Sequence, residues 1–240
     1  MNSFSRLPDS VDSSRQFSMY KDDTTVDVTY DYFKHFDKVS LQDVILKWRI
    51  VFHHTHQFRP YSELDYENII PVVRKYFSPS EKVHRYVDSI KQKYKIDCNN
   101  CIAVYYRGTD KATETQLCDF DDFYSRIKQM CELHPDKKVL VQSDSATFLD
   151  YMMSTSTPVV IVQENDSSYS NKGIHNVSSA QKNYTDMFFL FSTFLIISKC
   201  KYIICSSGNC SLWMMLYRGN GRNVLQYLSG KWHNSVECEA

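Results

Sequence analysis

The stretch CIAVYYRGTDKATETQ, residues 101–116, decides the fold of this chain, because a buried strand passes directly into a polar turn. Residues 102–106 form a continuous apolar run, which is typical of a strand covered on both faces. The next five residues, RGTDK at 107–111, bring a guanidinium, a hydroxyl, a carboxylate and an ammonium group to the end of that strand. Since ligands bind beyond the carboxyl ends of parallel strands, this turn predicts a ligand site.

The sequence after residue 100 predicts strands that alternate with helices. We expect strands at 101–106, 139–143, 158–163, 202–205 and 223–228, with helices at 120–133, 184–198 and 210–217 and another that Asp144 or Ser145 caps. This alternation predicts an α/β fold with a Rossmann-like parallel sheet of about five strands.

The chain ahead of this region differs in composition, which predicts a division into three parts. Residues 1–30 are rich in Ser, Asp and Thr and are expected to be loosely ordered. Residues 31–97 are expected to form a mainly helical N-terminal region, with helices near 40–56 and 78–95. Ser78 and Glu81 resemble a capping box with Pro79 at the first helical position. Residues 98–240 are expected to form the Rossmann-like domain.

Composition and charge exclude some classes of function. The chain has 240 residues, with 28 Lys+Arg and 28 Asp+Glu, so it lacks the basic excess of a general nucleic-acid binder. The most apolar run, at 187–197, is shorter than the roughly 20 residues that span a bilayer and is expected to be a buried helix. No secretory signal is visible, which favours a cytoplasmic location.

The cysteines and histidines give no clear metal site. Cys98 and Cys101 have C-x-x-C spacing, but no second pair completes a zinc site, and free thiols in a reducing compartment are expected. His53 and His56 would share a helix face without a carboxylate or cysteine to complete a ligand set. We therefore expect no metal.

Polar residues end three of the predicted strands, at 107–111, 143–145 and 206–209. The carboxyl ends of parallel strands meet at one edge, so these three turns should lie together. Arg107 offers a bidentate fork to phosphate, and residues 206–209 offer hydroxyl groups and backbone N–H groups at a helix N-terminus. Asp144 can accept hydrogen bonds from a base edge or a ribose. Together they describe a nucleotide diphosphate pocket, although neither a dinucleotide-binding glycine motif nor a P-loop is present.

Simpler interpretations stay open for single residues. Asp144 could serve only as a helix cap, and residues 206–209 could be an ordinary capped turn. Lys111 and Glu114 could be a solvated i, i+3 pair. Arg107 is harder to explain in this way, because a guanidinium directly after buried strand residues needs a partner.

Three segments, YYRGTDK, VQSDSATF and IICSSGNCSLWMM, resemble in this order the three motifs of the fucosyltransferase superfamily, the α1,2-, α1,6- and protein O-fucosyltransferases. The resemblance covers about residues 98–217. It implies a GT-B glycosyltransferase whose C-terminal half binds GDP-fucose without a metal ion or other cofactor. The mainly helical region 31–97 would then be a reduced acceptor-side half. Tyr105, Gly108 and Ser145 depart from the family pattern, in which histidine, arginine and a second carboxylate are frequent.

The resemblance also implies roles for individual residues. Arg107 would neutralise the β-phosphate of the departing GDP, and Glu114 would act as the base on the acceptor hydroxyl. The expected catalytic residues are Arg107, Lys111 and Glu114, and the expected nucleotide-sugar-binding residues are Tyr105, Arg107, Asp110, Asp144, Ser145, Ser206, Ser207, Gly208 and Asn209.

Two functions follow from this sequence. One is a metal-independent, inverting glycosyltransferase that transfers a sugar, fucose by the resemblance, from a GDP-sugar to a glycan or protein acceptor. The other is a nucleotide- or glycan-binding module, a relative without turnover. A binding module needs Arg107 and residues 206–209 but no base, so Glu114 discriminates between the two.

Overall fold

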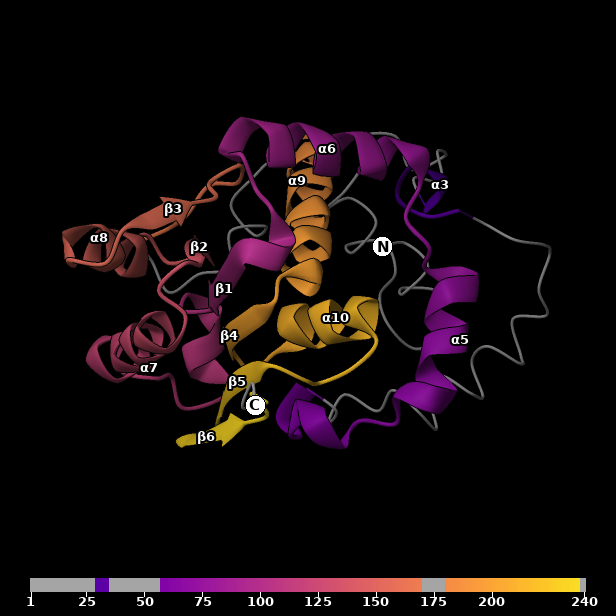
Figure 1. The fold of residues 1–240 in the computed structure, drawn as a ribbon. Helices are drawn as coiled ribbons and strands as arrows, with labels where there is room; N and C mark the ends of the chain where they lie inside the picture. The colour runs from indigo at the N-terminus through magenta and orange to yellow at the C-terminus, as the bar shows by residue number, and fades with distance from the viewer. Residues whose placement is uncertain (1–28, 35–56, 170–179, 238–240) are drawn as a thin grey trace.

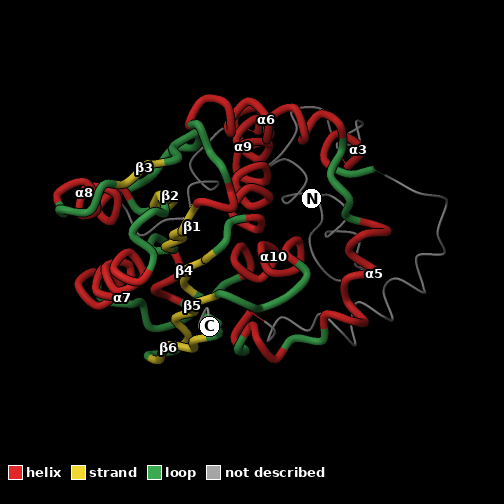
Figure 2. The backbone as a smooth tube through the Cα atoms, in the orientation of Figure 1, coloured by secondary structure: helices red, strands yellow, loops and turns green. Residues whose placement is uncertain are grey.

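The computed structural model describes residues 29–34, 57–169 and 180–237. Within these ranges the chain forms one six-stranded sheet with helices on both of its faces (Figures 1 and 2). The predicted helix near 40–56, the two histidines in it and nearly all of the N-terminal segment lie outside the described residues.

The helices and strands follow one another in a regular order. They are α3 (Thr29–Tyr32), η2 (Tyr61–Glu63), α5 (Tyr66–Tyr76), α6 (Glu81–Tyr94), η3 (Cys98–Asn100), β1 (Cys101–Tyr106), η4 (Asp110–Thr113), α7 (Phe120–Leu133), β2 (Lys138–Ser143), α8 (Ala146–Ser154), β3 (Val159–Ile161), α9 (Ala180–Lys199), β4 (Tyr202–Ser206), α10 (Asn209–Arg218), β5 (Val224–Leu228) and β6 (Lys231–Asn234).

The order of the strands fixes where a ligand can bind. The sheet runs β3-β2-β1-β4-β5-β6, and all neighbouring pairs are parallel except β5 and β6. From β1 the chain proceeds outward through β2 to β3, then returns to place β4 on the other side of β1. The carboxyl ends of β1 and β4 therefore form the switch point of a Rossmann-like sheet, where a crevice opens for ligands. The predicted α/β fold class is confirmed.

Strand β1 shows why the sheet is buried on both faces, since all six of its residues are buried. Ala103 and Tyr105 pack into a core with α9, α10 and the N-terminal helices α3, α5 and α6. Val104 and Tyr106 pack into a second core with α7 and α8, on the opposite side in Figure 1. Continuous apolar runs are required in such a strand, because water reaches neither face.

The structure corrects several predicted boundaries. The sheet has a sixth strand, β6, which the sequence did not indicate and which forms an antiparallel hairpin with β5 through Ser229 and Gly230, both at positive φ. β3 is shorter than predicted, and α9 begins four residues earlier than the predicted residue 184. Of the two candidate caps for α8, Ser145 is the actual one, because its hydroxyl accepts a hydrogen bond from the Phe148 backbone N–H at 3.3 Å.

The predicted capping box at the start of α6 is wrong. Ser80 caps this helix, with its hydroxyl accepting from the Val83 backbone N–H. Pro79 instead pairs with Phe33 in an isolated bridge, and the Ser78 hydroxyl donates to the Arg74 carbonyl at the end of α5. A pairing with residues far away in the chain therefore holds 78–79 outside the helix.

The apolar run at 187–197 lies in α9, and most of its side chains are buried in the first core, as predicted. Among the described residues, no helix has both the length and the apolar character that crossing a membrane requires.

Candidate functional site

Arg107 lies at the end of β1 and is held by two carboxylates. Its Nε lies 3.0 Å from Asp144 Oδ2, and its Nη2 lies 2.8 Å from Asp110 Oδ1. The side chain of Arg107 is 21% exposed and that of Asp144 is 8% exposed. The guanidinium is thus fixed in orientation by charge-assisted hydrogen bonds and still reaches the edge of the sheet.

Asp144, at the end of β2, also fixes the turn that follows β1. One of its oxygens accepts from the Gly108 backbone N–H at 2.8 Å, and the other accepts from the Thr109 hydroxyl at 2.7 Å. The carboxylate therefore ties the two strand ends together and is not the cap of α8. In this structure both of its oxygens are engaged within the protein.

Gly108 has a packing reason to be glycine. A Cβ at this position would lie 2.7 Å from Tyr106 Cε1 and 3.0 Å from Ser145 Cβ. The Tyr106 ring is itself fixed by stacking on Phe148, at 4.2 Å between ring centroids. The departure from the arginine of the family motif is thus built into the packing of this turn.

The turn after β4 leads into the N-terminus of α10. Ser206 lies near β1, since its hydroxyl accepts from the Arg107 backbone N–H at 3.4 Å. The Ser207 hydroxyl turns toward β5, donating to the Tyr227 carbonyl and accepting from Gln226 Nε2. The partial positive charge of the α10 N-terminus faces the same edge as Arg107, an arrangement that favours an anion.

Lys111 lies between this turn and a segment from the N-terminal region. Its Nζ donates to Glu114 Oε2 at 2.5 Å and to Gln57 Oε1 at 3.0 Å, and it lies 5.2 Å from the centroid of the Phe58 ring. The lysine side chain is 5% exposed, whereas that of Glu114 is 44% exposed. Glu114 is therefore the member of the pair that can move, while Lys111 stays in place.

A cavity of about 70 Å³ lies where these groups converge. Its lining contains seven of the predicted site residues, Tyr105, Arg107, Lys111, Glu114, Ser206, Gly208 and Asn209, together with Cys210 and Ser211. Asp110 and Asp144 stand behind Arg107, while Ser145 and Ser207 are engaged elsewhere. This volume suits a single anionic group, because pockets for whole ligands measure about 300–1,000 Å³. A nucleotide sugar would have to extend beyond it.

Two residues of the site, Gln57 and Tyr61, belong to no sequence motif and were not predicted from the sequence. Tyr61 is buried under the α10 N-terminus, where its hydroxyl accepts from the Gly208 backbone N–H at 3.1 Å and lies 2.7 Å from Ser211 Oγ. Burial raises the pKa of this phenol far above its ordinary value, so it stays neutral. Gln57 and Tyr61 were missed because their partners are remote in the chain, 54 residues away for Gln57 and 147 or 150 residues away for Tyr61.

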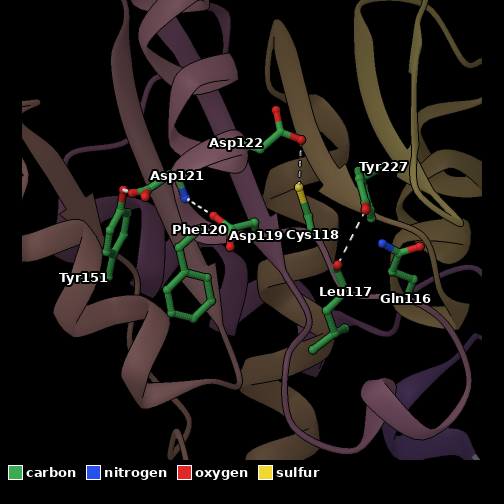
Figure 3. Close-up of a pocket in the computed structure, with 9 residues that line it drawn as sticks. All are labelled: Gln116, Leu117, Cys118, Asp119, Phe120, Asp121, Asp122, Tyr151 and Tyr227. Atoms are coloured by element: carbon green, nitrogen blue, oxygen red, sulfur yellow. Dashed lines mark hydrogen bonds between the residues drawn. The ribbon is translucent and has the colours of Figure 1, made fainter.

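A larger hollow of about 710 Å³ lies beside the turn after η4 (Figure 3). It is lined by Gln116, Leu117, Cys118, Asp119, Phe120, Asp121, Asp122, Tyr151 and Tyr227. Its carboxylates have partners already, since Asp121 accepts from the Tyr151 hydroxyl at 2.6 Å and Asp122 accepts from Trp232 Nε1 at 2.9 Å. Among the described residues, no Lys or Arg lines this hollow, so it disfavours a phosphate, and its lining contains none of the predicted site residues.

No protein-family model and no curated protein sequence matches this chain. The crystal structure of NodZ alpha-1,6-fucosyltransferase soaked with GDP-fucose aligns at a TM-score of 0.51 and 15% identity, over 82% of this chain and 65% of that one. The fold is fucosyltransferase-like. The predicted resemblance is thus confirmed for the fold, and this chain spans just under two thirds of the length of that NodZ chain.

Further alignments are weaker. Fucosyltransferase NodZ from Bradyrhizobium aligns at a TM-score of 0.45 and 13% identity, over 68% of this chain and 49% of that one. Arabidopsis thaliana FUT1 in complex with GDP aligns at 0.39 and 15% identity, over 70% of this chain and 37% of that one. Within the described ranges, no group of three or more His, Cys, Asp or Glu side chains is arranged to hold a metal ion.

Proposed function

We propose that this chain is a metal-independent, inverting glycosyltransferase that transfers a sugar from a GDP-sugar to a hydroxyl of a glycan or protein. The observation that carries the proposal is the meeting of Arg107, Lys111 and the α10 N-terminus at one cavity, at the switch point of a fucosyltransferase-like sheet. Fucose is the proposed sugar because of the motif resemblance. Residues 98–240 are the proposed donor domain, and 31–97 the proposed acceptor side.

The β-phosphate of the donor is proposed to occupy the cavity. Arg107 would bind its oxygens with the part of the guanidinium that Asp144 and Asp110 leave available, and the α10 N-terminus would add its partial positive charge. Two cations here face three carboxylates, so the arriving phosphate must compete for a cation. Lys111 is the one that can exchange partners, because Glu114 is exposed enough to swing away.

This exchange would also prepare the base. In the transfer step the acceptor hydroxyl attacks the anomeric carbon from the face opposite to GDP, and the bond from that carbon to the β-phosphate oxygen breaks. Glu114 would take the proton from the attacking hydroxyl. Arg107, Lys111 and the helix N-terminus would stabilise the negative charge that develops on GDP, without the help of a divalent ion.

A binding module without turnover is the second candidate, and one observation favours it. The 2.5 Å contact between Lys111 and Glu114 keeps the proposed base in an ion pair, so it is not poised as a base in this structure. Both candidates require the same donor pocket and differ in whether Glu114 works.

The test is release of GDP from GDP-fucose without divalent metal, measured for the wild type and Glu114→Gln. Glu132→Gln is the matched control, because Glu132 also faces a lysine, Lys128 at 4.0 Å, on the exposed side of α7. We expect loss of turnover only in Glu114→Gln, with GDP binding retained. Equal turnover in both variants would remove Glu114 from the mechanism, and GDP binding without turnover in the wild type would favour the binding module.

A further inference from the structure

Three cysteines from separate parts of the chain meet at the end of the sheet opposite to the cavity. Cys98 lies in η3, Cys101 begins β1, and Cys200 lies between α9 and β4. The seven cysteines in the described residues are all free thiols. The sequence spacing pairs only Cys98 with Cys101 and gives no sign that Cys200 lies beside them.

Cys200 is the member that joins the other two. The Cys200 thiol lowers the pKa of both Cys98 and Cys101. The sulfur atoms of Cys98 and Cys200 lie 3.7 Å and 3.4 Å from the same acceptor, the Ile196 carbonyl oxygen. The backbone is fixed there as well, because the N–H that follows Cys200, that of Lys201, donates to the Cys98 carbonyl at 2.9 Å.

The three thiols differ in access. Cys98 is partly exposed, whereas Cys101 and Cys200 are fully buried. The neighbouring Cys200 thiol is the main cause that lowers the pKa of Cys98 to about 7, and Lys91 of α6 adds to this effect, while burial and Asp97 oppose it. The neighbouring Cys101 and Cys98 thiols, together with burial, raise the pKa of Cys200 well above its ordinary value. An accessible thiolate thus adjoins a buried, protonated thiol, as in redox-reactive sites.

We propose that Cys98 is an oxidation site for hydroperoxides and that Cys200 resolves it by forming a Cys98–Cys200 disulfide. In the first step the Cys98 thiolate attacks one peroxide oxygen, the O–O bond breaks, and a sulfenic acid and a hydroxide or alkoxide form. In the second step the Cys200 sulfur attacks the Cys98 sulfur, and the sulfenic oxygen leaves as water with the thiol proton. Two electrons pass from the two sulfur atoms to the peroxide.

This assignment differs from the pair that the sequence spacing suggests. The sulfur atoms of Cys98 and Cys200 share an acceptor atom, the Ile196 carbonyl oxygen, whereas only the C-x-x-C spacing pairs Cys98 with Cys101. The disulfide would link η3 to the junction of α9 and β4. This link lies at the amino ends of β1 and β4, whose carboxyl ends form the cavity. The proposal does not depend on the proposed transferase activity.

The test treats the reduced full chain with hydrogen peroxide and maps disulfides by mass spectrometry under non-reducing conditions. We expect a Cys98–Cys200 crosslink that persists in Cys101→Ser and is lost in Cys98→Ser. In Cys200→Ser, Cys98 should instead accumulate as a sulfenic acid that dimedone traps. A Cys98–Cys101 crosslink, or no oxidation at Cys98, would overturn the proposal.

Alkylation by iodoacetamide gives a second readout without peroxide. Since the thiolate is the reactive form, labelling of Cys98 should rise with a midpoint near pH 7. Cys131 is the matched control, because it is also partly exposed and burial raises its pKa above the ordinary value. Equal labelling of the two cysteines at pH 7 would contradict the assignment.

Discussion

At the scale of single residues, the carboxylate of Asp144 organises the site more than its place in the motif suggests. The sequence offered two roles for it, a helix cap or a nucleotide contact. The structure excludes the cap, because Ser145 caps α8. Arg107, Gly108 and Thr109 engage both oxygens of Asp144, and the nucleotide contact stays a prediction. A sequence can place a carboxylate at a strand end, but it cannot show which donors from another strand reach it.

The pairing of Arg107 with Asp144 leads to a prediction about stability. In Arg107→Ala the buried carboxylate loses its cation, and breaking such a pair costs about 3 kcal/mol of unfolding free energy. The double variant Arg107→Ala/Asp144→Asn should recover part of this loss, because the more deeply buried charge, that of Asp144, is removed together with its cation. Denaturant unfolding measures both, and a double variant less stable than the single one would contradict the account.

Glycine at position 108 permits a second prediction. Gly108→Ala places a methyl group against the fixed Tyr106 ring and should cost about 1–3 kcal/mol. Gly208→Ala is the comparison, because its Cβ would lie farther from its nearest neighbour, at 3.2 Å from Cε of Lys111. Thermal unfolding should therefore show a larger loss for Gly108→Ala. The reverse order would mean that the Tyr106 ring moves more readily than the lysine.

At the scale of helices and strands, local sequence patterns predicted the parallel strands and α7. Contacts between residues remote in the chain determined the features that the sequence did not predict. The parallel strands followed from continuous apolar runs, and α7 has the predicted bounds, because both depend on neighbouring residues. The start of α6 was wrong because residues 78–80 pair with residues 32–34. The contribution of Tyr61 to α10 could not be predicted either, since the two are remote in the chain.

Tyr61 provides a prediction for the junction between η2 and α10. Tyr61→Phe would leave the buried Gly208 N–H without the phenol oxygen that now accepts from it, at a cost of about 1–3 kcal/mol. Tyr86→Phe is the control, because the Tyr86 ring stacks on Phe188 at 5.1 Å and the substitution retains that stacking. Chemical denaturation should separate the two variants. Equal stability would mean that the hydroxyl of Tyr61 contributes nothing to the position of α10.

At the scale of the whole molecule, the strand order brings the site together. β1 and β4 are neighbours although the residues of their last pair in register, Tyr105 and Cys205, are 100 positions apart, with β2 and β3 lying between them in sequence. Their carboxyl ends hold the proposed donor pocket, and their amino ends hold the cysteine cluster. The converging strand ends were foreseeable from the alternation of strands and helices. The cysteine cluster was not, because only the fold brings Cys200 beside Cys98.

The measurement that tests the central claim most directly is calorimetry of GDP, UDP and ADP binding without divalent metal, on the wild type and Arg107→Lys. The lysine keeps the charge near Asp144 but loses the bidentate fork. We predict selective GDP binding that weakens at least about tenfold in Arg107→Lys and stays unchanged in Arg85→Ala, a control on the exposed side of α6. If the folded wild type binds no nucleotide, or if Arg107→Lys binds GDP as tightly as the wild type does, the donor site is not at these strand ends.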